Sequence, residues 1–237
     1  MPIKNLYFRF SLLGTILAII GVSGFAALGI WQTLRAYEKQ ELQQSVDNAA
    51  QQEPFNLNNN QSAISTKIYQ KVRLTGQYDK NNEILIDNIV YKGTAGYHIL
   101  TPFKLENSEI HIMINRGWVP VGNDRNTLPV IKTPEDVQTI HGIIAPHRSK
   151  PPLILGELDT TARVWPYFDI KEYTNQRHID LLPVVILLDK NDSNGYVREW
   201  PKYDAKMGMH IGYAIQWYVF AIIVLVTYLA VNIKKKD

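Results

Sequence analysis

The stretch FSLLGTILAIIGVSGFAALGIW, residues 10–31, contains no charged side chain. It is long enough to cross the hydrocarbon core of a bilayer as an α-helix. A second run of the same kind, IGYAIQWYVFAIIVLVTYLAVNI, covers residues 211–233. The two runs predict one transmembrane helix near each end of the chain, with a large domain, residues 35–209, between them.

The first apolar run also has features of a secretory signal peptide, because Lys4 and Arg9 precede it as a basic region would. Its apolar stretch exceeds the roughly 7–15 residues typical of such signals, and no small-x-small cleavage site follows it. The N-terminus also lacks the Arg- and Ser-rich composition of a mitochondrial transit peptide, which favours a bacterial protein. We therefore expect a membrane helix that is retained.

Basic residues at both ends of the chain predict the orientation of the helices. Lys4 and Arg9 lie in the N-terminal tail, residues 1–9, and Lys234–Lys236 lie in the C-terminal tail, residues 234–237. Lys and Arg near a span mark the cytoplasmic side of a membrane. The prediction is a helical hairpin in a bacterial cell inner membrane, with both termini cytoplasmic and the central domain periplasmic.

Composition and motifs exclude several classes of function. The 237 residues include no Cys, which rules out disulfides, thiolate zinc sites and a Cys nucleophile. The formal net charge of +3 comes from the basic tails, so nothing indicates a basic face for nucleic acid. The sequence has no phosphate-binding loop, nucleophile elbow or metalloprotease motif, and its 6 His show no metal-ligand spacing. We expect no enzyme and no directly bound metal ion.

Alternating apolar and polar residues predict β-strands between the two apolar runs. In residues 67–78 the apolar side chains Val72, Leu74 and Tyr78 share one face, and residues 83–91 return as a second strand after a turn. The other expected elements are a hairpin of 97–105 with 109–119, strands at 137–145 and 183–190, a short helix at 171–182, and a polar helix at 38–52 that Pro54 ends. The predicted fold class is a membrane protein with two transmembrane helices flanking a mainly antiparallel β (α+β) domain, either an open sheet or a partial barrel.

A candidate ligand zone lies where the two membrane helices reach the outer leaflet. The hairpin brings together His210, Tyr213 and Trp217 of the second helix and Trp31, Gln32 and Arg35 of the first. Imidazole ligates iron, Arg pairs with carboxylates, and Trp and Tyr faces hold flat apolar rings. The zone suits an amphipathic ligand such as a haem. The same residue types also anchor many membrane helices without any further function, and that alternative stays open.

Three segments occur together in a characteristic order. They are GIWQTLRAYEK from Gly29, NRGWVP from Asn115 and HIGYAIQW from His210. In order and placement they resemble the signature blocks of the Surfeit locus protein 1 family, assembly factors for haem–copper cytochrome c oxidase. The resemblance implies a non-catalytic factor that binds haem a transiently. Bacterial members of that family hand haem a to oxidase subunit I. The partners that the resemblance implies are therefore subunit I, the haem a synthesis machinery and the lipid bilayer.

The resemblance also implies roles for individual residues. The haem ligand of the family maps to His210, and the residues that would shape or orient the site are Arg35, Gln32, Trp31, Tyr213 and Trp217. The family often has Asn immediately before this histidine, whereas this chain has Gly208 and Met209. Met209 is expected to be an apolar interface residue, not a second ligand.

The middle segment is expected to form a strand end that leads into a turn. Its residues are Asn115, Arg116, Gly117, Trp118 and Pro120. Gly117 would allow a backbone conformation that a β-carbon forbids, and Pro120 would stiffen the exit of the strand. One interpretation is a structural corner; the other is that Arg116 and Trp118 face a partner protein or a haem propionate.

Two other functions remain open from the sequence. A protein-interaction scaffold could stabilise nascent subunit I without binding haem, and it would not depend on His210. An envelope enzyme would require an external Asp, Glu or His essential for turnover, and the sequence nominates none.

Overall fold

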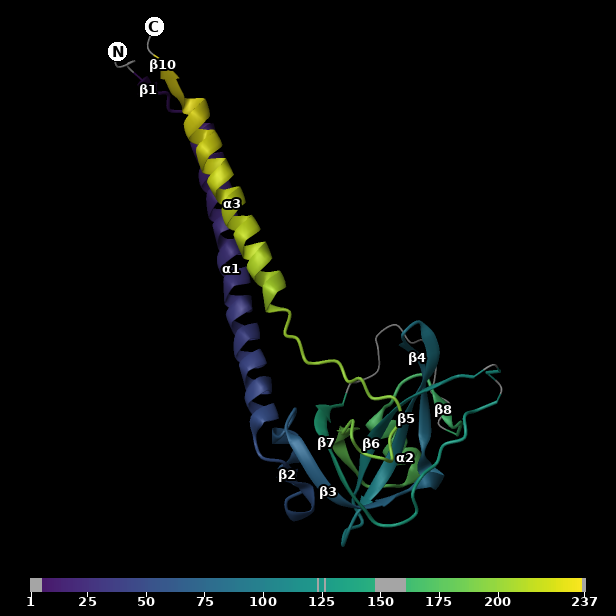
Figure 1. The fold of residues 1–237 in the computed structure, drawn as a ribbon. Helices are drawn as coiled ribbons and strands as arrows, with labels where there is room; N and C mark the ends of the chain where they lie inside the picture. The colour runs from purple at the N-terminus through teal and green to yellow at the C-terminus, as the bar shows by residue number, and fades with distance from the viewer. Residues whose placement is uncertain (1–5, 123, 126, 148–160, 236–237) are drawn as a thin grey trace. The chain divides into compact units, whose positions relative to one another are not determined.

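The computed structural model describes residues 6–122, 124–125, 127–147 and 161–235 (Figure 1). The chain divides into two compact units. One comprises Met1–Ser45 with Tyr203–Asp237, and the other comprises Val46–Lys202. The first unit is a helical hairpin and the second is a β domain.

Two long helices form the hairpin. Helix α1 covers Leu12–Gln51 and helix α3 covers Met207–Asn232. Both are long and apolar enough to cross a membrane, and only 6% and 11% of their most apolar stretches are buried within the protein. The core helix of a soluble protein would bury those side chains. The predicted fold class, two membrane helices flanking a mainly antiparallel β domain, is confirmed.

The two helices run antiparallel and touch along one seam. Near one end, the hydroxyls of Thr15 and Tyr228 are 2.7 Å apart. Near the other, a β-carbon added to Gly29 would lie 2.5 Å from the ring of Tyr218. Only glycine leaves room for that ring, so the small residue sets how closely the backbones approach.

A short β-ribbon joins the two ends of the hairpin. Strand β1 (Leu6–Phe8) pairs antiparallel with β10 (Ile233–Lys235). The backbone N–H of Arg9 donates to the carbonyl of Asn232 at 2.7 Å. Leu6 and Lys235, the first and last residues that the structure describes, therefore lie at the same end of the helix pair, as a two-span hairpin requires.

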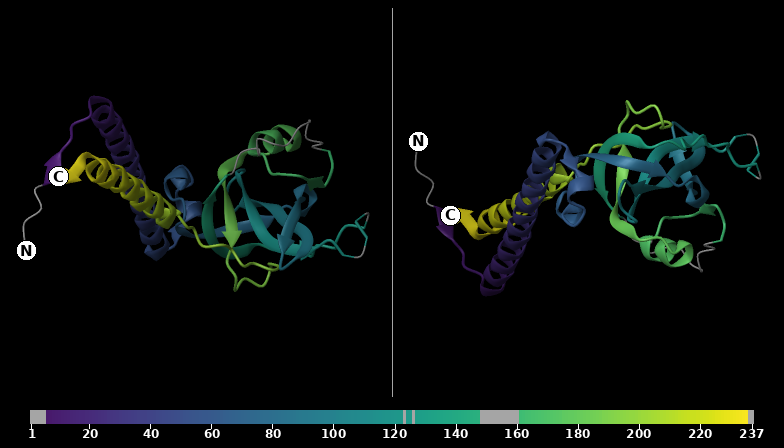
Figure 2. Two further views of the ribbon diagram at one scale, coloured as in Figure 1. Left: turned by 90° about the horizontal axis from the view of Figure 1, so that it is seen from above. Right: turned by 90° about the horizontal axis from the view of Figure 1, so that it is seen from below.

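The β domain is built on a closed barrel. Around the barrel the strands follow the order β3 (Lys71–Tyr78), β7 (Gln138–Pro146), β9 (Leu181–Leu188), β6 (His111–Pro120) and β5 (Thr94–Leu105), and β5 pairs again with β3. The pairs are antiparallel except for β6 with β9. Figure 2 shows these strands curving around a common interior. Closure leaves none of these strands with a fully unpaired edge.

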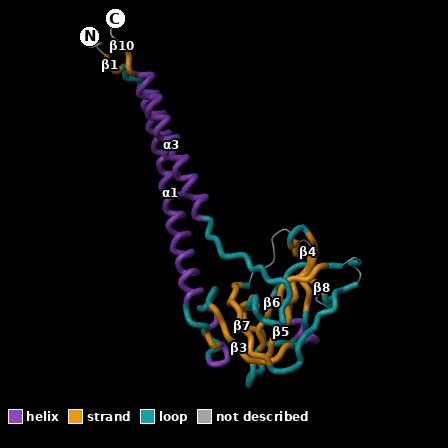
Figure 3. The backbone as a smooth tube through the Cα atoms, in the orientation of Figure 1, coloured by secondary structure: helices purple, strands orange, loops and turns teal. Residues whose placement is uncertain are grey.

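Smaller elements attach to the barrel (Figure 3). Strand β4 (Ile84–Tyr91) pairs with β5 and carries β8 (Val164–Trp165) on its other side, and β2 (Phe55–Asn56) pairs with β3. The helices are α2 (Ile170–Arg177) and the short 3-10 helices η1 (Leu57–Asn59), η2 (Ile64–Thr66) and η3 (Lys80–Asn82).

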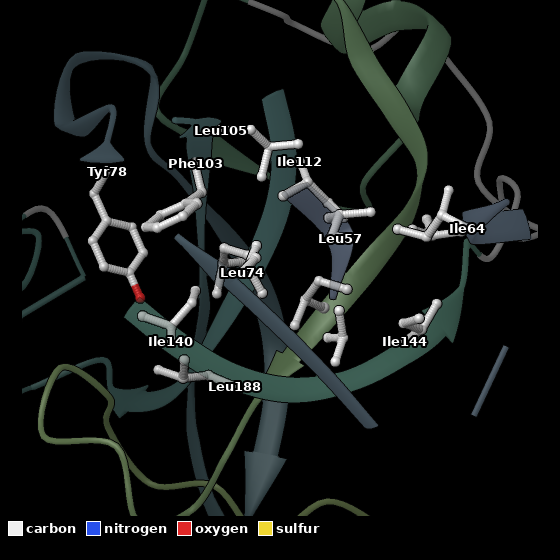
Figure 4. Packing of buried hydrophobic residues seen from close by; sticks show 14 residues of the cluster. Leu57, Ile64, Leu74, Tyr78, Phe103, Leu105, Ile112, Ile140, Ile144 and Leu188 are labelled. Carbon is white, nitrogen blue, oxygen red and sulfur yellow. The ribbon is translucent and has the colours of Figure 1, made fainter. Parts of the chain in front are cut away.

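Apolar side chains fill the barrel (Figure 4). Alternate residues of β3, Val72, Leu74 and Tyr78, point inward as the sequence alternation predicts. The ring of Tyr78 stands edge-on to Phe103, with the ring centroids 4.9 Å apart. Burial raises the pKa of the Tyr78 hydroxyl well above its ordinary value. The neutral phenol is therefore part of the core.

The strand positions were predicted better than their pairing. The hairpin of β5 with β6 is confirmed, as are strands near 137–145 and 183–190. The predicted hairpin of 67–78 with 83–91 is wrong, because β3 pairs with β7 and β5. Strand β4 instead turns back onto β5 through Lys92 and Gly93, whose φ angles of 47° and 82° suit a tight two-residue hairpin.

The two helices predicted outside the membrane spans are both present, one of them shorter than predicted. The polar helix continues out of the first apolar run and ends at Gln51, before Pro54, as expected. The short helix is α2, which ends earlier than predicted because His178 has a φ of 52° and stops it. The predicted residues 181–182 belong to β9 instead.

Candidate functional site

The centre of the candidate site is a contact between the two membrane helices. The Nδ1 atom of His210 lies 2.8 Å from Oε1 of Gln32, although the two residues are 178 positions apart. Gln32 is buried, with 8% of its surface exposed, and His210 is partly buried. The first and third characteristic segments of the sequence thus meet at one hydrogen bond.

Three aromatic rings define one edge of the helix seam. The ring of Phe25 stacks on Trp217 at 5.7 Å between centroids and lies 5.6 Å from Phe220, and Trp217 and Phe220 are 5.8 Å apart. These three residues are called the aromatic edge below. The opposite edge is covered by Tyr218, whose hydroxyl is 3.2 Å from that of Thr33.

Helical spacing places two further predicted residues on the aromatic edge. Tyr213 precedes Trp217 by four residues, so the two side chains lie on the same side of α3. On α1, Phe25, Leu28, Gln32 and Arg35 follow one another at intervals of three or four residues, so their side chains lie on the same side of the helix. Tyr213 and Arg35 therefore flank the His210–Gln32 contact on the side of the aromatic edge.

The remaining predicted residues are more exposed than this pair. Trp31 and Tyr213 are 51% and 50% exposed, and among the described residues no hydrogen bond joins either to His210. Arg35 pairs with Glu38 at 2.7 Å, both side chains being about half exposed. Such an exposed pair is weak and can be exchanged for another carboxylate. The structure brings His210 and Gln32 into contact and leaves Arg35, Trp31 and Tyr213 available beside them.

Sequence reasoning missed Phe25, Phe220 and Tyr218. The sequence does contain a spacing that could have identified the aromatic contacts. Phe25 lies seven residues before Gln32, and Trp217 lies seven residues after His210. A seven-residue repeat is typical of two helices packed along a seam. Gln43 was missed as well. Its amide oxygen accepts from the backbone N–H of Ala205 at 3.0 Å, which fixes the start of α3 on α1.

Arg116 of the middle segment is buried inside the β domain, with 1% of its side chain exposed. Its guanidinium donates to Glu83 at 3.2 Å, to the Asn194 carbonyl at 2.9 and 3.0 Å, and to Thr133 and the Lys132 carbonyl at 2.6 Å. With its donors occupied in this way, Arg116 has no surface to offer a partner or a propionate. In this structure it is a structural residue.

The middle segment forms the end of β6, as predicted, but its residues up to Pro120 all belong to the strand and none of them forms the predicted turn. It lies within β6, where the pairing with β5 shifts between Leu100–Asn115 and His98–Trp118 and so forms a bulge. Gly117 occupies the bulge with a φ of 115°, and a β-carbon there would lie 2.7 Å from the Val197 carbonyl. The expected backbone role of Gly117 is confirmed.

The other residues of the segment also make structural contacts. The indole N–H of Trp118 donates to the Ile89 carbonyl at 2.9 Å, and Trp118 is 7% exposed. Pro120 ends β6 opposite Gly96. The side-chain amide of Asn115 donates to Nδ1 of His98 at 3.3 Å. The side chains of Asn115, Arg116 and Trp118 are thus all engaged within the β domain.

His98 is a titratable group whose pKa is changed by its burial beside this segment. It lies next to Asn115 and edge-on to Trp200, with the ring centroids 5.7 Å apart. Burial lowers its pKa from 6.5 to about 4, because the charged imidazolium is poorly solvated there. His98 is therefore neutral at physiological pH and serves packing. Within the described residues, no cluster of three His, Asp or Glu side chains could hold a metal ion.

Comparison with known proteins aligns most of the hairpin and the whole β domain with one family. The family model described as SURF1 family matches residues 19–222. The chain is 28% identical over 209 residues to the SURF1-like protein of Rickettsia prowazekii (strain Madrid E), which covers 85% of this chain and 82% of that protein. It is 24% identical over 210 residues to the SURF1-like protein of Monosiga brevicollis, covering 84% and 79%.

A yeast relative carries a more specific name. The chain is 25% identical over 171 residues to the cytochrome oxidase assembly protein SHY1 of Saccharomyces cerevisiae (strain ATCC 204508 / S288c), covering 70% of this chain and 44% of that protein. The family match begins within α1 and ends within α3, so it includes both Gln32 and His210.

Proposed function

The chain belongs to the SURF1 family, and from this premise we propose that it assists the assembly of cytochrome oxidase by binding haem a and presenting it to subunit I. The assembly role is supported by the family and by the name of the yeast relative. The haem-binding step is supported by the contact between His210 and Gln32. No catalytic step is part of the proposal.

The His210–Gln32 contact carries the proposal because of its surroundings. It lies between two apolar helices, at the end of the hairpin away from the β1–β10 ribbon. An imidazole at that position can ligate iron while the apolar part of a ligand stays in contact with lipid and aromatic side chains. The available groups, one His, one Arg and several rings, fit a haem with its carboxylates.

Each residue has a distinct part in the proposed site. His210 would hold the iron through a ring nitrogen, and Arg35 would exchange Glu38 for a propionate, to which it can donate two parallel hydrogen bonds. Tyr213 and Trp217 would lie against the apolar ring, with Trp31 at its margin. When bound, haem a supplies the redox chemistry that the oxidase uses.

The proposal includes a location. We place the hairpin in a bacterial inner membrane with the β1–β10 ribbon on the cytoplasmic side, because Arg9 and Lys234 lie there. The β domain is then periplasmic, on the side where the His210–Gln32 contact lies. Nascent subunit I and the haem a synthesis machinery are the partners that this arrangement would serve.

Replacing His210 by Ala in cells tests the proposal. In a strain that lacks its own copy of the gene, we expect wild type to restore the haem a absorbance of oxidase membranes and His210→Ala to leave it at the level of the deletion strain. The matched control is His141→Ala, because His141 is exposed on β7. It should restore the absorbance fully, with equal amounts of all three proteins by immunoblot.

The opposite result would favour the scaffold alternative. If His210→Ala restores the haem a absorbance as well as wild type does, handover through His210 is wrong. A scaffold that stabilises nascent subunit I without binding haem would then explain the family's role.

A further inference from the structure

We infer that Gln32 is a positioning residue: it holds the His210 ring in the tautomer that leaves Nε2 as the nitrogen available for a ligand. The identity of the ligand, a haem iron, rests on the proposed function. The tautomer does not, because it is a property of the protein before any ligand binds.

The direction of the hydrogen bond follows from the atoms that form it. The Oε1 atom of a glutamine side chain carries lone pairs and no hydrogen, so it can only accept. At 2.8 Å from it, Nδ1 of His210 must be the donor. In a neutral imidazole only one nitrogen carries a proton, so Nε2 keeps its lone pair. Metal ligation needs that lone pair.

Burial keeps the glutamine in place. Gln32 is 8% exposed and lies one turn from Gly29, which is covered by Tyr218. A polar side chain inside an apolar helix pair is costly unless it is hydrogen-bonded. The contact with His210 provides that hydrogen bond from the neighbouring helix. Breaking the hydrogen bond would leave the buried Gln32 amide oxygen without a donor, so the bond from His210 Nδ1 is maintained.

The same contact orients the imidazole ring. Because Nδ1 is held by α1, the ring cannot turn freely about its side-chain bonds, and Nε2 is directed away from Gln32. In metal sites, an acceptor on the distant nitrogen both fixes the ring and strengthens the ligating nitrogen, and its loss typically costs about 10–100-fold in affinity. An amide oxygen does this without adding a buried charge to the helix seam.

Three substitutions separate this role from a structural one. Gln32→Leu removes the acceptor and keeps an apolar side chain of similar length, whereas Gln32→Glu keeps an acceptor and strengthens it. Gln40→Leu makes the same change as Gln32→Leu at an exposed position of α1.

Nitrogen-15 NMR of histidine-labelled protein in detergent at pH 8, without haem, tests the inference. The His210 signal is assigned by its loss in His210→Ala. We expect Nδ1 to be protonated in wild type, Gln32→Glu and Gln40→Leu, and the proton to move to Nε2 in Gln32→Leu. A wild-type His210 protonated mainly on Nε2 would overturn the inference, even if neither Gln32 variant folds. So would a tautomer that Gln32→Leu leaves unchanged.

Adding haem a to the same samples separates this inference from the proposed function. We expect Gln32→Leu to bind haem a about 10–100-fold more weakly than wild type, with affinity retained in Gln32→Glu. If the tautomer behaves as expected but wild type binds no haem, the proposed function fails and the positioning role stands. If wild type binds haem and Gln32→Leu binds it equally well, the positioning role fails alone.

Discussion

Replacing Arg116 by Leu is expected to destabilise the β domain by about 3–5 kcal/mol. The substitution leaves the carboxylate of Glu83, 2% exposed, with only one of its two guanidinium partners. It also removes the donor to the Asn194 carbonyl and leaves the Lys132 carbonyl with only the Tyr196 hydroxyl, at 3.3 Å. Removing one member of a buried ion pair is costly because the other charge stays in a poorly solvated place. Arg163 remains, but it is 42% exposed and cannot replace those contacts.

Hydrogen exchange on the full-length protein in detergent measures this loss. Amides of β6 and β5 should exchange through unfolding of the β domain, so their protection reports its free energy of unfolding. The control is Arg125→Leu, which removes an exposed arginine 3.5 Å from Asp87 and should cost less than about 1 kcal/mol. If Arg116→Leu keeps wild-type protection yet oxidase assembly fails, Arg116 serves a partner and the structural interpretation is wrong.

Acidification is expected to weaken the β domain through His98 before it affects the carboxylates. The folded pKa of about 4 lies below the ordinary value of 6.5, so the unfolded chain binds more protons between these values. Stability from the neutral ring is therefore complete above about pH 6.5 and is lost as the pH falls toward 4. The full loss amounts to about 3–4 kcal/mol, at about 1.4 kcal/mol per pKa unit.

A pH series with His98→Gln isolates this contribution. Between pH 7.5 and 5, wild type should lose about 2 kcal/mol more stability than His98→Gln, measured by the same amide protection. His141→Gln, changed at an exposed His of β7, should follow the wild-type curve. Hydrogen bonds lower the pKa of the exposed carboxylates Glu109, Glu135 and Glu199, which places their titration below this window. Parallel pH curves for wild type and His98→Gln would show that burial of His98 does not control acid stability.

The membrane helices could be predicted because their signal is local. A long uncharged apolar run requires no knowledge of the rest of the chain, and the hairpin follows from the basic residues at its ends. The same topology correctly brought residues 31–35 and His210 to one level, and the structure adds the hydrogen bond between Gln32 and His210. The seven-residue repeat on both helices contained that information, since it aligns Phe25 with Trp217 and Gln32 with His210.

Strand pairing in the β domain could not be predicted in the same way. Alternation in residues 71–78 identifies the inward face of β3, but closure of the barrel decides which strands lie beside it. Arg116 illustrates the same limit of prediction from sequence for a single side chain. A charged side chain in a strand is ordinarily exposed, and it is buried here because Glu83, 33 residues earlier, supplies the opposite charge. Such pairs depend on contacts that a single sequence does not reveal.

The most direct test of haem binding is an optical spectrum of the purified protein in detergent, coexpressed with the enzymes of haem a synthesis. Wild type should show a haem a band, and His210→Ala, recovered in equal amount, should lose it while His141→Ala keeps it. Such a result would support haem a binding through His210. A folded wild-type protein without any haem a band would contradict it, and the scaffold function would then stand in its place.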